Sequence, residues 1–189
     1  NLGLSEEQAL TEAKRCLDCA NPSCMEGCPV GIDIPGFVKN IERGEFLEAA
    51  RTLKKTSALP AVCGRVCPQE KQCESRCIHL KMGHEAVAIG YLERFAADYE
   101  RESGQISVPE IAAKNGIKIA VVGSGPAGLS FAGDMAKMGY DVTVFEALHE
   151  IGGVLKYGIP EFRLPNKIVD VEIENLSKMG VTFVKDCIV

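Results

Sequence analysis

Hydrophobic residues follow two different spacings in this chain, and the change comes near residue 110. Up to about residue 105 they recur at steps of three and four, which is typical of amphipathic helices. The clearest example spans residues 86–101, and its apolar side carries Ile89, Leu92, Phe95 and Tyr99. Shorter helices are predicted from the Ser-Glu-Glu-Gln capping box at residue 5, from Pro35, and over residues 45–55. Strand-like alternation is almost absent, so this part is predicted to be all-helical.

After residue 116 short apolar runs alternate with amphipathic stretches. The runs at 117–122, 142–146 and 181–184 predict three β-strands, of which the first is expected to be buried. One helix is predicted to end near Met138 and another to run from Pro165 to Met179. Strands that alternate with helices in this way indicate βαβ units with right-handed crossovers.

Residues 103–116 combine Gly, Ser, Pro and Asn with one short apolar piece, and we interpret them as a linker. The predicted fold class is therefore α plus α/β. An all-helical, ferredoxin-like domain is expected over residues 1–112, followed over residues 113–189 by part of a Rossmann-type domain. The sequence opens on Asn1 without an initiator Met and stops at Val189 just after a strand. We therefore expect a fragment of a longer protein.

The composition of the chain limits the kinds of molecule that it is expected to bind. The 189 residues are 46% hydrophobic and 25% charged, as in an ordinary globular protein. A net charge of −5, no basic stripe and only four Tyr and seven Phe argue against nucleic-acid binding. Apolar stretches are short and interrupted, so neither a membrane span nor a signal peptide is predicted. The expected location is the cytoplasm, where thiols stay reduced.

Eight of the nine cysteines fall in two tight runs. Their spacings are C-x2-C-x4-C-x3-C-P and C-x3-C-P-x4-C-x3-C, and the runs comprise Cys16, Cys19, Cys24 and Cys28, then Cys63, Cys67, Cys73 and Cys77. Crowded thiolates suit the soft iron of a [4Fe–4S] cluster, and a Cys-Pro pair closes the bacterial ferredoxin run. Two structural zinc ions are the alternative, because four-cysteine zinc sites also use C-x2-C pairs.

Counting alone assigns all eight cysteines to two four-cysteine clusters. On its residue pattern alone, Glu93 is an exposed or arginine-paired carboxylate within the main helix. The isolated Cys187 is expected to be a buried small apolar residue. The three histidines, His79, His84 and His149, have no catalytic pattern and are expected at the surface.

A glycine-rich turn follows the first predicted strand. It consists of Gly123, Ser124, Gly125, Pro126, Ala127 and Gly128, and a helix follows it, which is the context of the dinucleotide fingerprint. Pyrophosphate would meet the N–H groups at the start of that helix. Glu146 comes eighteen residues after Gly128, at the end of the second strand, where a carboxylate accepts hydrogen bonds from a ribose diol and repels a 2′-phosphate. The pair Gly152-Gly153 favours FAD over NAD, and glycine required only for packing is the remaining alternative.

Three motifs together carry a resemblance to a known family. They are Cys16-Leu-Asp-Cys19-Ala-Asn-Pro-Ser-Cys24-Met-Glu-Gly-Cys28-Pro, Cys63-Gly-Arg-Val-Cys67-Pro-Gln-Glu and Gly123-Ser-Gly-Pro-Ala-Gly128. The chain resembles the NADPH-dependent glutamate synthase small-subunit family, which includes the large subunit of the electron-bifurcating NADH-dependent ferredoxin:NADP oxidoreductase. Residues 88–99 look closest to that bifurcating branch. The N-terminal part of dihydropyrimidine dehydrogenase is a more distant relative.

The resemblance implies two [4Fe–4S] clusters with interleaved ligands. One cluster would be held by Cys16, Cys19, Cys24 and Cys77. The other would be held by Cys28, Cys67, Cys73 and the side chain of Glu93, which leaves Cys63 as a non-ligand. FAD would contact the turn from Gly123 to Gly128, Glu146, Gly152, Gly153, Val154, Arg163 and Val189. These assignments replace the simple count of cysteines.

The function implied by this resemblance is electron transfer between FAD and a partner redox subunit. That partner would be a glutamate synthase large subunit or a flavin- or ferredoxin-type subunit, and an NADPH domain would lie in a part of the protein outside this sequence. The fragment by itself is expected to be inactive as an oxidoreductase. The alternative function is a metal-stabilised docking module for subunit assembly, without electron transfer.

Overall fold

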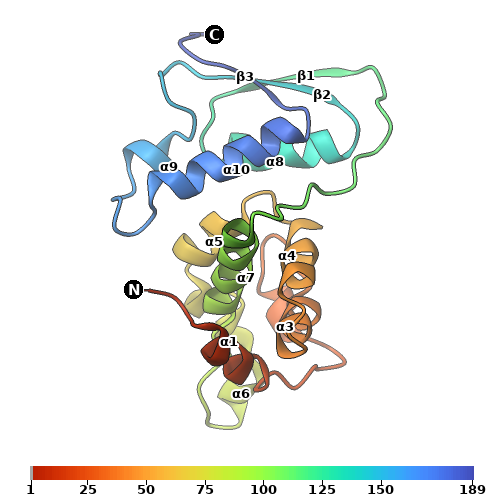
Figure 1. The fold of residues 1–189 in the computed structure, drawn as a ribbon, viewed down its shortest axis with the longest axis vertical. Helices are drawn as coiled ribbons and strands as arrows, with labels where there is room; N and C mark the ends of the chain where they lie inside the picture. Colours follow the sequence, from red (N-terminus) through yellow and green to blue (C-terminus); the bar gives the residue numbers. More distant parts are fainter. Residues whose placement is uncertain (1) are drawn as a thin grey trace. The chain divides into compact units, whose positions relative to one another are not determined.

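Two structural units make up the chain, one up to Ser107 and one from Val108 (Figure 1). The computed structural model describes residues 2–189. Helices predominate, together with a small parallel sheet of three strands. In the described part of the chain, no helix is long and apolar enough to cross a membrane.

The elements of the first unit are helices joined by the cysteine-bearing loops. The α-helices are α1 (Glu6–Ala13), α2 (Ser23–Glu26), α3 (Ile34–Glu42), α4 (Phe46–Lys54), α5 (Pro60–Val66), α6 (Ile78–Lys81) and α7 (Ile89–Ser103). Two 3₁₀ turns, η1 (Gln69–Lys71) and η2 (Glu74–Arg76), lie between α5 and α6. The capping box at Ser5 is present, and Gly104 ends α7 at a φ of 70°. The predicted helices from residue 5, from Pro35 and over 86–101 are confirmed.

Apolar side chains of α1, α3, α4 and α7 form one core in this unit. Its fully buried members include Phe37, Ile41, Leu53 and Leu92. Phe46 packs edge-to-face on Phe95 and Tyr99 of α7, with ring centroids 5.1 and 4.8 Å away. The long helix α7 packs against both α4 and α5, and α5 contains Cys63 (Figure 1).

A buried ion pair links α4 and α7 near the C-terminal end of the first unit. Lys54 and Glu100 are 6% and 4% exposed, and Lys54 Nζ lies 2.5 Å from Glu100 Oε2. Lys54 also donates to the carbonyl of Ser107 at 2.9 Å, while the N–H and hydroxyl of Ser107 donate to Glu100 Oε1 at 3.0 and 2.5 Å. Both charges are therefore compensated within the same small network.

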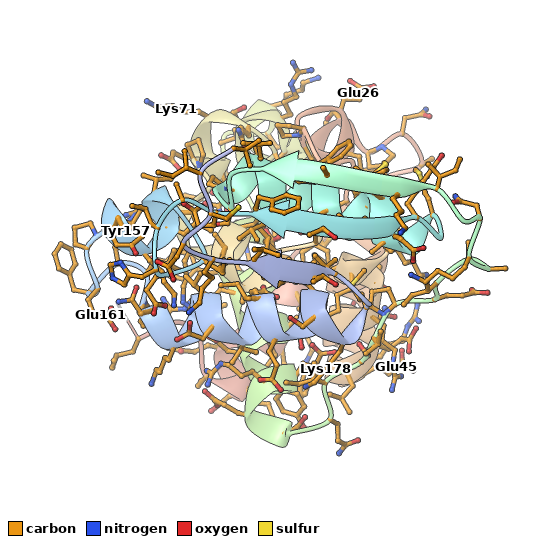
Figure 2. All side chains as sticks on the ribbon, turned by 90° about the horizontal axis from the view of Figure 1, so that it is seen from above. Glu26, Glu45, Lys71, Tyr157, Glu161 and Lys178 are labelled. Carbon is orange, nitrogen blue, oxygen red and sulfur yellow. The ribbon has the colours of Figure 1, made fainter. Side chains whose placement is uncertain are left out.

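The second unit is a parallel βαβ arrangement. Its elements are β1 (Lys118–Val122), α8 (Pro126–Lys137), β2 (Asp141–Phe145), α9 (Val154–Tyr157), α10 (Asn166–Lys178) and β3 (Thr182–Val184). The strand order is β1-β2-β3, with Val121 opposite Val144 and Val144 opposite Phe183. Figures 1 and 2 show α8 and α10 on the same face of this sheet.

Strand β1 corrects one prediction from the sequence. The run 117–122 was expected to be a buried strand, but Val121 is its one buried residue, while Ile117 and Val122 are exposed. The reason is that β1 lies at an edge of the three strands and only its Val121 face meets the helices. Val142 and Val144 of β2, the central strand, are buried.

The Lys54–Glu100 pair generates a stability prediction. Lys54→Met leaves the Glu100 carboxylate buried without its counter-charge, and we expect the free energy of unfolding to fall by about 3–5 kcal/mol. Anaerobic denaturant unfolding followed by circular dichroism measures this change. The control is Arg51→Met, which removes an exposed ion pair with Glu48 and should cost about 0–1 kcal/mol. Equal effects of the two substitutions would refute a stabilising role for the buried pair.

Candidate iron–sulfur and nucleotide sites

One group of four thiols lines a cavity in the helical unit. The four are Cys16, Cys19, Cys24 and Cys77, and apolar side chains such as Ile34 line the same cavity. Cys16 follows α1 and donates its N–H to Ala13 O at 3.1 Å, Cys24 lies in α2, and Cys77 separates η2 from α6. These are the four cysteines that the resemblance assigns to a single cluster.

Burial and mutual repulsion act on these thiols. Burial is the main reason that the pKa of Cys24 rises to about 11, and negative charge on Cys16 and Cys77 raises it further. The pKa of Cys16 is raised by burial and, more weakly, by Cys19, whereas the N–H of Asp18 and the nearby ammonium of Lys39 lower it. Thiolates at Cys16 and Cys24 are therefore unfavourable unless a cation accompanies them, and this donor chemistry fits a cluster.

The second group combines cysteines with a carboxylate. Cys73 is buried, and its pKa rises to about 12 through burial, then through repulsion from Glu74, Cys28 and Glu93. Glu93 is 5% exposed, so the exposed position suggested by its residue pattern is wrong. The structure thus brings Cys28 of the first run and Glu93 of α7 close to Cys73 of the second run.

Cys63 and Cys67 belong to the same neighbourhood. A hydrogen bond from the Cys63 thiol lowers the pKa of Cys67 to about 7, and the pKa of Cys63 is raised by that hydrogen bond, by burial and by Glu93. The two residues are four apart at the end of α5, where Cys67 N–H donates to Cys63 O at 3.0 Å. Five donor side chains therefore gather here, of which the resemblance uses four.

Close contact between α5 and α7 holds this second group together. A Cβ on Gly64 would lie 2.5 Å from the backbone nitrogen of Arg94, and a Cβ on Gly90 would lie 2.3 Å from Gln69 Cδ. No side chain larger than hydrogen fits at either position without displacing its neighbour. Cys63 and Glu93 are sequence neighbours of Gly64 and Arg94, so this approach brings them together.

A single-ion site and an iron–sulfur cluster require different spacings of their donors. Within residues 2–189, no three His, Cys, Asp or Glu side chains converge on one point as ligands of a metal ion. A tetrahedral zinc ion needs four sulfurs at about 2.3 Å from one point, whereas a cubane is bound at four separate iron corners. All nine cysteines are free thiols.

The glycine-rich turn of the second unit leaves its backbone accessible. Gly123 has a φ of 93°, and a Cβ on Gly128 would lie 2.1 Å from Gly123 O, which excludes any side chain there. A Cβ on Gly153 would lie 2.9 Å from Gly125 Cα, so the two glycine turns meet backbone to backbone. Helix α8 begins at Pro126, within the Gly123–Gly128 turn, and a glycine turn that leads into a helix N-terminus suits a phosphate group.

Glu146 lies at the end of β2 and is 7% exposed. Its Oε2 accepts from Ser124 N–H at 2.9 Å and from Ser124 Oγ at 2.5 Å, and its Oε1 accepts from Leu148 N–H at 2.9 Å. The hydrogen bond from the Ser124 hydroxyl is the main reason that the pKa of Glu146 is lowered. The carboxylate is therefore ionised at neutral pH, and it lies next to the turn.

Ser124 has a role that the sequence did not reveal. Its buried hydroxyl donates to Glu146 and accepts from Gly152 N–H at 2.9 Å, so it joins the glycine-rich turn, the end of β2 and the second glycine pair. The serine occupies a variable position of the fingerprint, which carries no signal of such a contact. Val154, Arg163 and Val189 have exposed side chains, and their assignment to FAD rests on the resemblance.

The remaining candidate residues fall outside these groups. His84 and His149 are exposed as expected, but His79 is half-buried, with Nε2 2.7 Å from Arg15 O. Cys187 is also half-buried, so its predicted burial is wrong, because it follows β3 in an open segment.

Comparison with known proteins identifies relatives of both units. Residues 121–180 match the NAD(P)-binding Rossmann-like domain. The NAD-dependent dihydropyrimidine dehydrogenase subunit PreT of Escherichia coli (strain K12) is 42% identical over 92% of this chain and 42% of its own length. The glutamate synthase [NADPH] small chain is 41% identical in Escherichia coli (strain K12) and 35% in Azospirillum brasilense, over 95% of this chain and 38% or 37% of those proteins.

The chain thus spans about two fifths of the length of these curated relatives. The predicted resemblance to the glutamate synthase small chain and to dihydropyrimidine dehydrogenase is confirmed. Residues 1–105, more than half of the chain, match the model described as dihydropyrimidine dehydrogenase domain II, 4Fe-4S cluster, and the chain belongs to this family.

Proposed function

We propose that this chain is the cluster-bearing part of an NAD(P)H-dependent flavin oxidoreductase, in which it transfers electrons between FAD and a partner subunit. The observation that carries the proposal is the sorting of donor side chains into two spatial groups, each drawn from both cysteine runs, in a chain of a 4Fe-4S family. When bound, two [4Fe–4S] clusters would supply one-electron transfer and FAD would exchange a hydride for single electrons.

Cys16, Cys19, Cys24 and Cys77 would hold the first cluster. The shared cavity and the mutual repulsion of Cys16, Cys24 and Cys77 support this set. The N–H of Asp18 donates to the Cys16 sulfur and that of Met25 to the Cys24 sulfur. Such hydrogen bonds stabilise negative charge on the ligands and thereby tune the reduction potential.

Cys28, Cys67, Cys73 and Glu93 would hold the second cluster. The burial of Glu93 and its interaction with Cys73 support the carboxylate as a ligand. Cys63 would remain outside the resident set, as a thiol that donates a hydrogen bond to Cys67. One hard oxygen ligand would give this cluster a potential different from that of the first.

FAD would bind to the second unit. The Gly123–Gly128 turn would receive pyrophosphate, Glu146 would accept hydrogen bonds from the ribose, and Ser124 would hold both turns in place. The NADPH domain and the partner, a glutamate synthase large subunit or another redox subunit, would belong to the intact enzyme. The proposed setting is the cytoplasm, where the nine thiols remain reduced.

Iron content and electron delivery test the proposal as a whole. The intact enzyme, purified without oxygen, should be brown and carry about eight irons per copy of this chain. It should also show electron paramagnetic resonance after reduction. Stepwise removal of iron should stop electron delivery to the partner while FAD is still reduced by NAD(P)H. Zinc at full occupancy, or unchanged delivery after iron removal, would instead support a docking module.

The choice between Glu93 and Cys63 has a separate test. Cys63→Ala should leave the iron content and the resonance spectrum unchanged, whereas Glu93→Ala should alter the spectrum and potential of one cluster, because an oxygen ligand is lost. Cys187→Ala, in the other unit, is the control. A cluster lost with Cys63→Ala and two unaltered clusters with Glu93→Ala would reverse the assignment.

Glu146 provides the test of the flavin site. Glu146→Ala removes a charged acceptor, and we expect FAD to bind about 10-fold more weakly or worse. FAD absorbance after ultrafiltration of the intact enzyme measures the retained fraction. Glu174→Gln alters an exposed carboxylate on α10 and should retain FAD as the parent does. Full retention with Glu146→Ala would exclude Glu146 from the site.

A further inference from the structure

The second glycine pair of the Rossmann-type unit, Gly152-Gly153, lies directly against the glycine-rich turn. A Cβ on Gly153 would lie 2.9 Å from Gly125 Cα, so the two backbones meet with no side chain in the way. Glycine loses more conformational freedom on folding than any other residue. Contacts from neighbouring side chains are therefore needed to hold the pair in this position.

Lys156 of α9 is one of these neighbours. Its side chain is 10% exposed, and its Nζ lies 2.7 Å from Glu150 Oε2 and also pairs with Asp170 Oδ1. Glu150 comes two residues before Gly152, whereas Asp170 belongs to α10. The ammonium group therefore connects the loop before the glycine pair with both α9 and α10.

The aliphatic stem of Lys156 lies beside the glycine pair as well. A Cβ on Gly152 would lie 3.2 Å from Lys156 Cγ and 3.3 Å from Val169 Cγ1. The next residue, Tyr157, adds a contact to the same loop, because its hydroxyl accepts from Glu150 N–H at 3.1 Å. Helices α9 and α10 pack against each other (Figure 1). Both parts of the lysine side chain thus act on the loop that carries the glycine pair.

The ammonium group is charged, while its two partners remain partly solvated. Burial lowers the pKa of Lys156, but hydrogen bonds with Asp170 and Glu150 raise it above its usual value. The side chains of Glu150 and Asp170 are 46% and 57% exposed, so water can solvate both carboxylates if the lysine is lost. We therefore expect removal of the ammonium group to release the loop at little cost in global stability.

We propose that Lys156 is a positioning residue of the flavin site, which holds Gly152-Gly153 against the glycine-rich turn through its ion pairs with Glu150 and Asp170. This inference rests on the proposed function, because it assigns FAD to these two turns. Without the ion pairs the loop gains conformational freedom, which FAD must remove again when it binds. The effect of Lys156 passes through the glycine pair and requires no contact with FAD.

The affinity of the intact enzyme for FAD, measured by fluorescence titration after removal of the flavin, tests this inference. Lys156→Met keeps an unbranched apolar stem beside Gly152 but lacks the ammonium group, and we expect the Kd for FAD to rise about 10-fold. Lys156→Arg retains a cation and should bind FAD more tightly than Lys156→Met. The matched control is Lys178→Met, which removes an exposed ion pair with Glu174 on α10 and should leave the Kd unchanged.

A double-mutant cycle shows whether Lys156 acts through the glycine pair. Ser124→Ala removes the hydroxyl that accepts from Gly152 N–H, so it loosens the same loop from the other turn. If both residues act on this loop, the rise in Kd in the double variant should be smaller than the product of the two single effects. A rise equal to that product would mean that the residues act independently, and it would contradict the positioning role.

An unchanged Kd for FAD in Lys156→Met would overturn the inference. If Lys156→Met also lowers the unfolding midpoint of the flavin-free protein, Asp170→Asn serves instead, because it removes one of the ion pairs at an exposed position. Weaker FAD binding by Asp170→Asn at the stability of the parent would then support the inference, and the parent's affinity would refute it. A parent enzyme that binds no FAD would contradict the proposed function itself, so the two failures are distinguishable.

Discussion

Repulsion among acidic groups that share a poorly solvated space is the constraint behind the helical unit. Burial raises the pKa of Cys24 and of Cys73, and neighbouring anions raise both further. A bound cation reverses this balance, because it favours the thiolate over the thiol. The helices therefore hold these donors in an arrangement that positive charge among them makes more favourable.

Local patterns predicted most of the helices and the βαβ succession. Ile89, Leu92 and Phe95 define one face of α7 in the sequence, and the structure buries that face. The proximity of Glu93 and Cys63 could not be predicted from the sequence, because it depends on packing between helices that are far apart in the chain. Gly64 permits the close approach of α5 to α7. The sequence shows that this residue is a glycine, but it does not show which part of the backbone lies against it.

In the second unit, too, local patterns were predictable from the sequence, whereas contacts between distant segments were not. The turn at 123–128 and the acid at 146 were recognisable, since their spacing follows from the strand–helix–strand path. The exposure of β1 was not predicted, because a run of apolar residues does not distinguish an edge strand from a central strand. The part played by Ser124 was missed as well, because a hydroxyl acquires its partners only after the loops have come together.

That serine has a consequence for how a ligand would be received. One hydroxyl connects Glu146 with Gly152, so neither glycine loop can shift without disturbing the other. A molecule that settles on the first loop meets a second loop already in position, and less conformational freedom remains to be lost when it binds. The Ser124 hydroxyl thus contributes directly to the pre-organisation of the two loops.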